Sequence, residues 1–340
     1  MTHAIFFAYN EKTARVDDIF YQHWFMRLTA GLHDKNVGAT IVNANVQTPM
    51  RIAVVVATIG RPAEVSELLR QLLAQTHPAS AIIISINETQ DLPPEIPDGV
   101  QIVAGPKGLP AQRNRGMAKV LSDCDLLAFF DDDYLPSIHA LAGIDRLFTR
   151  FPELVGVNGI LLADGINSAG IVYEDAIVML KEHDKHSLSF EPRVLRKLAG
   201  LYGCNMVYRA SAIEHTRFDE KLPLYGWQED VDFAAQLLPR GLLVATDAFV
   251  GVHRGVKSAR TSGLKFGYSQ IVNPIYLSRK GTMKPWYAAQ LILCNLAANH
   301  VRALRPEPWV DRKGRLLGNW LGIRDVLMRR DDPRHILSLP

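Results

Sequence analysis

The stretch "RIAVVVATIGRPAEVSELLRQLLAQTHPASAIIISIN", residues 51–87, decides the fold of this chain. Residues 51–58 form an apolar run rich in β-branched side chains, which is typical of a buried strand. Residues 62–75 carry apolar side chains at helical spacing, and Pro62 suits the first turn of a helix. A second buried strand is predicted over residues 81–87. This order predicts two parallel strands joined by a crossover helix.

The same alternation continues further along the chain. Strands are predicted over 100–105, 126–130 and 154–162, and helices over 110–122 and 137–151. Continuous apolar strands that alternate with helices predict an α/β fold with a mostly parallel central sheet and helices on both faces. In such sheets ligands bind outside the carboxyl ends of the strands. Polar residues at those ends are therefore the first candidates for a functional site.

The second half of the chain is less uniform. Residues 163–200 are rich in turn formers, and we expect a long, irregular insertion there with a functional role or high mobility. A strand is predicted within 204–213, a helix within 225–241 and a strand over 242–253. From about residue 258 the chain is expected to be mainly helical and basic.

Composition limits the class of protein. The chain has 340 residues, of which 48% are hydrophobic, so it can bury a sizeable core. Its formal net charge of +3 is too balanced to indicate nucleic-acid binding. Lys and Arg crowd the last third, which indicates a partner with phosphates. Cys124, Cys204 and Cys294 lie far apart, which argues against a disulfide scaffold and fits a reducing compartment.

Membrane and targeting segments are not predicted. The first residues lack a basic segment and a long apolar core, so we expect no signal peptide. No apolar run reaches about 18 residues, the length that would indicate a spanning helix. The best candidate, residues 286–304, contains several amides and is interpreted as a packed or interfacial helix. A cytoplasmic location is expected, with contact at the inner face of the plasma membrane left open.

Three aspartates, Asp131, Asp132 and Asp133, follow the predicted strand at 126–130. Because alternate side chains of an extended segment share a face, Asp131 and Asp133 should point one way and Asp132 the other. Adjacent ionised carboxylates repel one another, and burial increases the repulsion. A Mg²⁺ or Mn²⁺ ion with substrate phosphate oxygens would make such a cluster useful. A polar turn after a buried strand is the alternative interpretation.

Two further acidic residues, Glu229 and Asp230, precede the predicted helix in "LYGWQEDVDF". Acidic residues in a first turn complement the helix dipole, which could explain them without any catalytic role. The aromatic, glycine-containing loop before them is unusual for a simple cap. Tyr225 and Trp227 could form a platform beside a sugar ring.

Two other motifs place basic and polar residues near ends of elements. His253 follows a predicted strand in "GVHRGVKSART", a position that suits a metal ligand, although a lone histidine is more often structural. Arg113 and Asn114 fall in the first turn of the helix predicted after "GPKG". A helix start with an arginine is a ready anion site. Solvated surface charge would explain Arg113 equally well.

In this order, the motifs resemble those of the family 2 glycosyltransferases, which have the Rossmann-like GT-A fold. "VVVATIGRP" looks like the first strand and nucleotide-binding turn, and "GLPAQRNRGM" is similar to the G-x-x-x-A-R-N-x-G segment. "FFDDDYLP" resembles the DxD motif, "YGWQED" the acceptor-side ED motif and "VHRG" the late metal-binding histidine. The resemblance covers about two thirds of the chain, from Arg51 to about Met283. The family's uracil-contacting aspartate is Asn87 here, which leaves the nucleotide open.

The resemblance implies an inverting, metal-dependent transfer of a sugar from a nucleotide-diphosphate sugar to an acceptor hydroxyl. It implies that Thr58, Arg61 and Asn87 line the base and ribose pocket. Asp131 and Asp132 would face the nucleotide or the donor sugar. The residues expected to contact the donor nucleotide sugar also include Asn114 and Trp227, together with the basic residues Arg113 and Lys257.

Metal and catalytic roles are also implied by the resemblance. Asp133, with Asp131 and His253, would bind Mg²⁺ or Mn²⁺ between the two phosphates. Arg113 and Lys257 would help to neutralise the leaving diphosphate. Asp230 is the expected general base, which takes the proton of the acceptor hydroxyl. Its neighbour Glu229 is expected to position the acceptor or the base.

The resemblance also implies a domain organisation and partners. Residues 1–50 are an extension of unknown role, and 51–257 a catalytic domain with a nucleotide-sugar half at 51–135 and an acceptor half at 136–257. The helical region 258–340 would contact the acceptor or a membrane surface. The expected donor is a nucleotide sugar, with a UDP-sugar favoured. The expected acceptor is a glycan or a lipid-linked molecule in bacterial-type polysaccharide or glycolipid assembly.

Two other enzyme classes remain as alternatives. A phosphotransferase of the haloacid dehalogenase type also ends a strand with DxD, but it usually has Thr or Val where Leu135 stands here. A sugar nucleotidyltransferase shares much of the fold, but residues 54–62 lack its glycine-rich phosphate loop.

Overall fold

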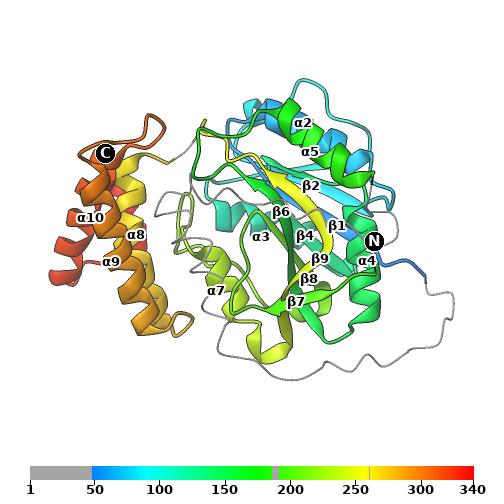
Figure 1. Cartoon of the computed structure of the whole chain (residues 1–340). Coiled ribbons are helices and arrows are strands. Elements are labelled where there is room, and N and C mark those ends of the chain that lie inside the picture. Colours follow the sequence, from blue (N-terminus) through cyan, green and yellow to red (C-terminus); the bar gives the residue numbers. More distant parts are fainter. Residues whose placement is uncertain (1–47, 186–190, 260) are drawn as a thin grey trace, which may run out of the picture. The chain divides into compact units, whose positions relative to one another are not determined.

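The computed structural model describes residues 48–185, 191–259 and 261–340. The predictions for residues 1–47 therefore lie outside the described residues. Figure 1 shows a sheet with helices on both of its faces and a further set of three helices, α8 to α10. The described strands are β1 (Ile52–Ala57), β2 (Ala81–Ile86), β3 (Val100–Ala104), β4 (Leu126–Asp131), β5 (Tyr134–Pro136), β6 (Leu154–Asp164), β7 (Val194–Lys197), β8 (Asn205–Arg209) and β9 (Leu242–His253).

These strands form one sheet in the order β3-β2-β1-β4-β8-β6-β9-β5, and β7 also pairs with β9. Strands β3, β2, β1 and β4 are parallel neighbours. Strand β8 runs antiparallel to both β4 and β6, so β6 and its parallel partner β9 have the same direction as the first four. Six of the nine described strands thus share one direction, and the predicted mostly parallel α/β fold is confirmed.

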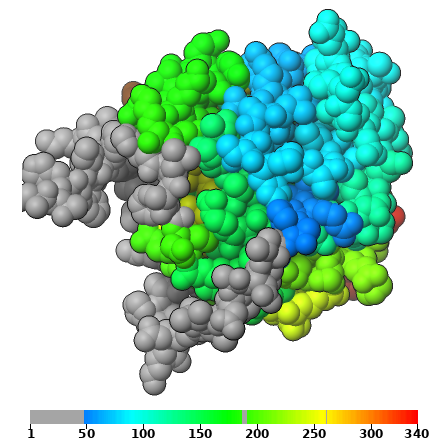
Figure 2. Space-filling view, turned by 90° about the vertical axis from the view of Figure 1, so that its right-hand side faces the viewer, coloured from blue at the N-terminus to red at the C-terminus, as the bar shows by residue number. Residues whose placement is uncertain are grey.

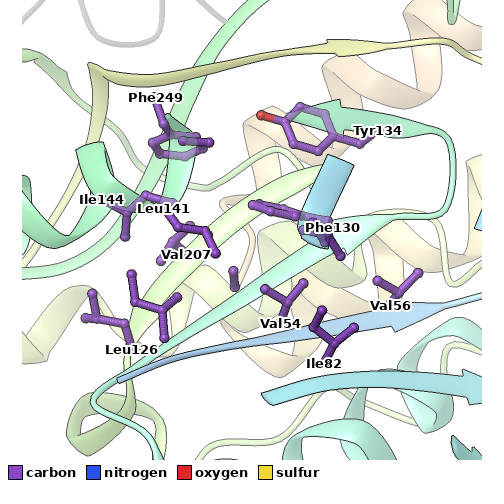
Figure 3. Close-up of a cluster of buried hydrophobic side chains, with 14 of the residues drawn as sticks. Val54, Val56, Ile82, Leu126, Phe130, Tyr134, Leu141, Ile144, Val207 and Phe249 are labelled. Atoms are coloured by element: carbon purple, nitrogen blue, oxygen red, sulfur yellow. The ribbon is translucent and has the colours of Figure 1, made fainter. Parts of the chain in front are cut away.

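Two helices cover one face of the sheet, α2 (Pro62–Leu73) and α4 (Ala140–Arg150). Their apolar residues pack on alternate side chains of the central strands, as Figure 3 shows for Val54, Val56 and Phe130. Burial of such side chains is worth about 1.5–3 kcal/mol each, which makes this cluster a main source of stability. The continuous apolar strands therefore bury side chains on both faces of the sheet, as expected for a sheet covered by helices on both faces.

The opposite face is covered by α3 (Leu109–Val120) and α7 (Glu229–Ala235). Helix α3 lies very close to β1 because residue 116 is glycine: a Cβ there would lie 2.4 Å from Cγ1 of Val55. Beside α7, the rings of Phe218 and Phe233 stack with centroids 4.0 Å apart. Both helices carry candidate site residues, so this packing fixes where those residues stand.

Residues 163–200 are more regular than the sequence predicts. They contain α5 (Tyr173–Asp184) and the edge strand β7. Helix α5 buries only Ala176 and Leu180, so its apolar stripe is too narrow to stand out in the sequence. It lies beside α2 in both views (Figures 1 and 2). The expectation of a wholly irregular insertion is therefore wrong for these two segments.

The C-terminal region contains α8 (Gly263–Lys280), α9 (Pro285–Arg302) and α10 (Arg312–Leu327), as predicted. Helices α8 and α10 approach closely through glycines, since a Cβ on Gly318 would lie 2.0 Å from the carbonyl oxygen of Leu264. Among the described residues, no helix has the length and apolar character needed to cross a membrane. The remaining described helices are short: α6 (Ala210–Ile213), η1 (Thr89–Asp91), η2 (Leu121–Asp123), η3 (Leu238–Arg240) and η4 (Pro333–Ser338).

Candidate active site at the carboxyl edge of the sheet

The ends of β1, β4 and β9 bring the predicted metal ligands together. Strand β4 runs parallel to β1 with Asp131 paired to Ala57, so both strands end at the same edge. The short strand β5 then pairs with β9 in a register that sets Tyr134 opposite His253. The aspartate just before β5 is thereby placed beside the histidine.

Asp131, Asp133 and His253 form a cluster whose ligand atoms lie within 4.8 Å of one another. Nε2 of His253 is 3.4 Å from Oδ1 of Asp133. Burial alone would raise the pKa of Asp133, but His253 and Arg61 beside it hold that pKa below its ordinary range. Two carboxylates and an imidazole on one side of a strand end are donors that Mg²⁺ and Mn²⁺ accept.

The orientation of His253 is set by residues that sequence analysis missed. Its Nδ1 lies 2.8 Å from Oδ1 of Asp164, and the Tyr202 hydroxyl donates to the same carboxylate at 3.2 Å. Burial lowers the pKa of His253, but Asp133 and Asp164 raise it more, and the net pKa lies well above the ordinary value. A carboxylate on Nδ1 leaves Nε2 directed at the cluster. No local signal marks Asp164, which ends a strand like many other residues.

Asp132 points to the other side of the strand end, as the alternation predicts. Its carboxylate accepts hydrogen bonds from Thr58 Oγ1 and Arg61 Nη1, both at 2.8 Å. Burial raises the pKa of Asp132 to about 7, although Arg61 opposes this shift. Thr58, Arg61 and Asp132 therefore form one buried group next to the metal cluster.

Asn87 lies at the neighbouring strand end, where Asp91 holds its backbone. Asp91 is buried and accepts hydrogen bonds from the amides of Gly60 (2.7 Å), Asn87 (2.9 Å) and Glu88 (2.9 Å). It thereby joins the turn after β1 to the turn after β2. The half-buried Asn87 thus lies at the same edge as Thr58. Sequence analysis missed Asp91.

Arg113 connects the aspartate cluster to the acidic pair on α7. Its guanidinium donates to Oδ1 of Asp131 at 2.8 Å and to the Gly203 carbonyl at 2.9 Å, and it pairs with Glu229. The side chain is buried, and three protein acceptors surround it. The structure therefore gives Arg113 a bridging position rather than that of an open anion site.

Glu229 and Asp230 stand at the start of α7 in different environments. Burial raises the pKa of Glu229 to about 8, against the opposing effect of Arg113, and its Oε2 has no hydrogen-bond partner among the described residues. Burial also raises the pKa of the more accessible Asp230. Oδ2 of Asp230 accepts from the Gly203 amide at 2.9 Å. The backbone of one residue, Gly203, thus contacts both Asp230, through its amide, and Arg113, through its carbonyl.

Asn114 and Lys257 make contacts within the protein instead of facing an open pocket. Asn114 holds the backbone of Phe218 through two hydrogen bonds of 2.9 Å. Nζ of Lys257 donates to the carbonyls of Gly165 (2.9 Å) and Ile166 (2.8 Å). The donor contacts expected for both residues stay predictions.

The aromatic residues before α7 gather around a ring from the C-terminal region. Phe266 of α8 lies 5.8 Å from the Tyr225 ring and 6.2 Å from the Trp227 ring. Trp227 is buried, whereas Tyr225 is 47% exposed. The guanidinium of Arg315 lies 4.4 Å from the Phe266 centroid. Tyr225 is therefore the accessible side of this aromatic group.

Comparisons with known proteins give only distant matches. No family model and no curated relative matches the chain. Similar solved structures include TarS of S. aureus (13% identity, TM-score 0.45, covering 76% of this chain and 44% of that one). Another is TarS 1–349 of S. aureus in complex with UDP (12% identity, TM-score 0.46, covering 85% of this chain and 90% of that one). A third is the mannosyltransferase PcManGT of Pyrobaculum calidifontis in complex with GDP-Man and Mn²⁺ (13% identity, TM-score 0.46, covering 86% of each chain). The chain thus spans less than half of the first of these. Likeness at this level carries no argument for this chain.

Proposed function

We propose that the protein transfers a sugar from a nucleotide-diphosphate sugar to an acceptor hydroxyl with the help of a divalent cation. The observation that carries this proposal is the buried cluster of Asp131, Asp133 and His253 at the carboxyl edge of a mostly parallel sheet. Edges of this kind are where α/β proteins bind nucleotides. A hydrolytic or phosphotransfer role would need a nucleophile at Asp131, and that carboxylate is instead paired with Arg113.

The residues present fit a divalent cation. Asp131 and Asp133 offer carboxylate oxygens, and because Asp164 pairs with Nδ1 of His253, Nε2 is directed at Asp133 within the cluster. The cation would neutralise the negative charge that develops on a leaving nucleoside diphosphate. Arg254 and Lys257 follow β9 in the chain, and the Arg254 amide donates to the Asp133 carbonyl at 2.9 Å. The guanidinium of Arg254 pairs with Glu67, so Lys257 is the residue proposed to add positive charge there. Thr58, Arg61 and Asn87 are then placed to line the nucleotide.

Asp230 is the proposed general base. In an inverting transfer the acceptor oxygen bonds to the anomeric carbon while the bond from that carbon to the diphosphate breaks, and the acceptor proton must go to a base. The raised pKa of Asp230 suits this role near neutral pH. Glu229 cannot easily take it, because it is buried against Arg113. We assign Glu229 to positioning Arg113.

The acceptor is proposed to lie against Tyr225. A half-exposed aromatic ring can stack on the apolar face of a sugar, and the proposed base, Asp230, stands five residues further on at the start of α7. Phe266 supports that ring from α8, so the C-terminal region contributes to the acceptor side. An acceptor sugar in polysaccharide or glycolipid assembly fits this arrangement.

A panel of nucleotide sugars tests the proposal. The protein is incubated with UDP-, GDP- and other nucleotide sugars and either Mg²⁺ or Mn²⁺, and release of nucleoside diphosphate is measured. We expect metal-dependent release with one nucleotide class, and its loss in Asp133→Asn. Asp123→Asn is the matched control, because Asp123 is exposed just before β4 begins, at the other end of the strand that ends at Asp131. Release that survives Asp133→Asn, or release of inorganic phosphate from phosphomonoesters instead, would contradict the proposal.

A further inference from the structure

The three C-terminal helices bury polar side chains where most helical proteins bury apolar ones. Between α8 and α9, Gln270 Nε2 donates to Asn295 Oδ1 at 2.5 Å, and Asn299 Nδ2 donates to Gln270 Oε1 at 2.9 Å. Asn299 also donates to Asn319 of α10 at 2.8 Å. All four amides are buried. These amides hydrogen-bond to one another, so a polar network is buried between the three helices beside the apolar cluster of Tyr268, Val272 and Ile336.

The outer sides of α9 and α10 are apolar instead. On α9, the exposed side chains include Trp286 (53%), Leu293 (65%) and Val301 (69%), and Leu304 just beyond the helix is 84% exposed. No Asp, Glu, Lys or Arg occurs from Pro285 to Val301. A helix with amides inside and apolar residues outside is the reverse of the usual pattern in water.

Helix α10 extends the same surface. Leu317, Trp320 and Leu327 are 53%, 55% and 79% exposed and lie at helical spacing. The ring of Trp320 packs against His300 of α9, with ring centroids 5.8 Å apart. The exposed apolar residues of the two helices therefore adjoin. We name this surface the outer face; it comprises Trp286, Leu293, Val301, Leu304, Leu317, Trp320 and Leu327.

Strong positive charge accompanies the outer face. Residues 279–330 contain eleven Lys and Arg and three Asp and Glu, a formal net charge of +8, whereas the whole chain has +3. Of the acidic residues, Asp325 is buried, and Glu307 pairs with Arg302 and Arg312. Arg279, Lys280 and Arg324 also pair with acidic residues, but the basic residues of this segment outnumber its acidic ones by eight. Exposed apolar side chains in a segment with a large net positive charge are the features of a segment that lies in a membrane interface.

We propose that the outer face docks in the plane of a membrane surface that contains anionic lipids. Apolar side chains would enter the boundary of the acyl chains while Lys and Arg contact the headgroups. A second copy of the chain is a poorer occupant, because two regions of charge +8 would repel each other. The inference goes beyond the transferase proposal and does not depend on it.

Vesicle flotation with the full-length protein tests this inference. We expect the protein to float with vesicles of phosphatidylglycerol and phosphatidylcholine, to float less with phosphatidylcholine alone, and to bind less as salt rises. Val301→Ser should weaken binding to the mixed vesicles by about tenfold, since that side chain would no longer gain from leaving water. In addition, brominated acyl chains should quench the fluorescence of the wild type and quench Trp320→Phe less.

Val178→Ser is the matched control. Val178 is 66% exposed on α5, nearly the same exposure as Val301, and lies on a helix that packs on the sheet. Vesicle binding should be unchanged in this variant. The inference is overturned if the wild type does not float, if both valine variants lose binding equally, or if Val301→Ser changes only self-association in sedimentation velocity.

Discussion

The sheet and the three C-terminal helices distribute their polar groups in opposite ways. In the sheet, the interior is aliphatic and aromatic, and buried charges gather at one edge, at Asp132, Asp133 and His253. In the helices, a network of neutral amides is buried beside a small apolar cluster, and further apolar side chains face outward. Both regions bury charges, but those of the helices, Arg312 and Asp325, each pair with an opposite charge from their own region, whereas the sheet edge gathers several acidic groups in one cluster.

We infer that the buried charges at the sheet edge serve chemistry, whereas the buried amides of the helices serve packing. A buried charge costs several kcal/mol unless it is paired, so a cluster of them persists where chemistry requires it. Amides that satisfy one another cost little and fix how helices fit together. Substitutions at the sheet edge should therefore lower activity with little loss of stability, and substitutions in the amide network should do the reverse.

The largest effect is expected from Asp230→Asn. Loss of the proposed base should lower kcat by about 10²–10⁴-fold. The carboxylate accepts from the amides of Gly203 and Val231, and asparagine keeps an acceptor for only one of them. The free energy of unfolding should change by no more than about 1 kcal/mol, because the loss of this hydrogen bond is offset by removal of a charge that burial disfavours. Steady-state kinetics and urea unfolding measure the two quantities. If Asp230→Asn loses much stability but keeps its kcat, Asp230 is a structural residue and not the general base.

The next effect is expected from Asp164→Asn. The change weakens the group that orients His253, and Mn²⁺ affinity should fall by about 10–100-fold. Tyr202→Phe keeps the carboxylate and removes one of its donors, so a smaller loss is expected. Titration of both variants with Mn²⁺ measures the effect. Unchanged affinity in Asp164→Asn would show that His253 is not a ligand.

In the helices, Asn319→Ala should act on stability alone. Its side chain accepts from Asn299 and donates to the Gly267 carbonyl, each at 2.8 Å, and both partners would lose this buried hydrogen bond. The free energy of unfolding should fall by about 1–3 kcal/mol, with kcat of the folded enzyme little changed. Asn167→Ala, at an exposed position, is the control. A loss of kcat without a loss of stability would place chemistry in the amide network.

The smallest effect concerns pH. Burial raises the pKa of Asp230, and the base must be ionised to accept a proton. We therefore expect kcat to reach its maximum above that pKa and to fall as the pH decreases through it. The acidic limb of the profile should therefore lie above about pH 4, the ordinary range of an aspartate. A limb at or below the ordinary range would mean that Asp230 is not the titrating base.

The sequence predicts those features that repeat locally. Continuous apolar runs that alternate with helices predict the sheet. The alternation of side chains in an extended segment separates Asp132 from Asp131 and Asp133, and the carboxyl-edge rule brings His253 to them. Pairs that join distant residues have no such local pattern. His253 and Asp164 are 89 positions apart, and Arg113 and Glu229 are 116 apart. These partners could not be predicted from single motifs.

The helical region shows a second limit of local patterns. The sequence predicts helices and a basic charge there, and both are found. The amides at Asn295 and Asn299 suggest a packed or interfacial helix, but periodicity cannot say which side of α9 faces inward. That depends on partners in α8 and α10, which lie on other segments of the chain.

Direct Mn²⁺ binding tests the central claim, which is a divalent cation site that works together with a nucleoside diphosphate. Electron paramagnetic resonance measures free Mn²⁺ during titration of the protein with and without UDP or GDP. We predict that one of the two nucleotides tightens Mn²⁺ binding, that Asp133→Asn abolishes the effect, and that Asp123→Asn retains it. Mn²⁺ binding that neither nucleotide alters, or that Asp133→Asn leaves intact, would contradict the account.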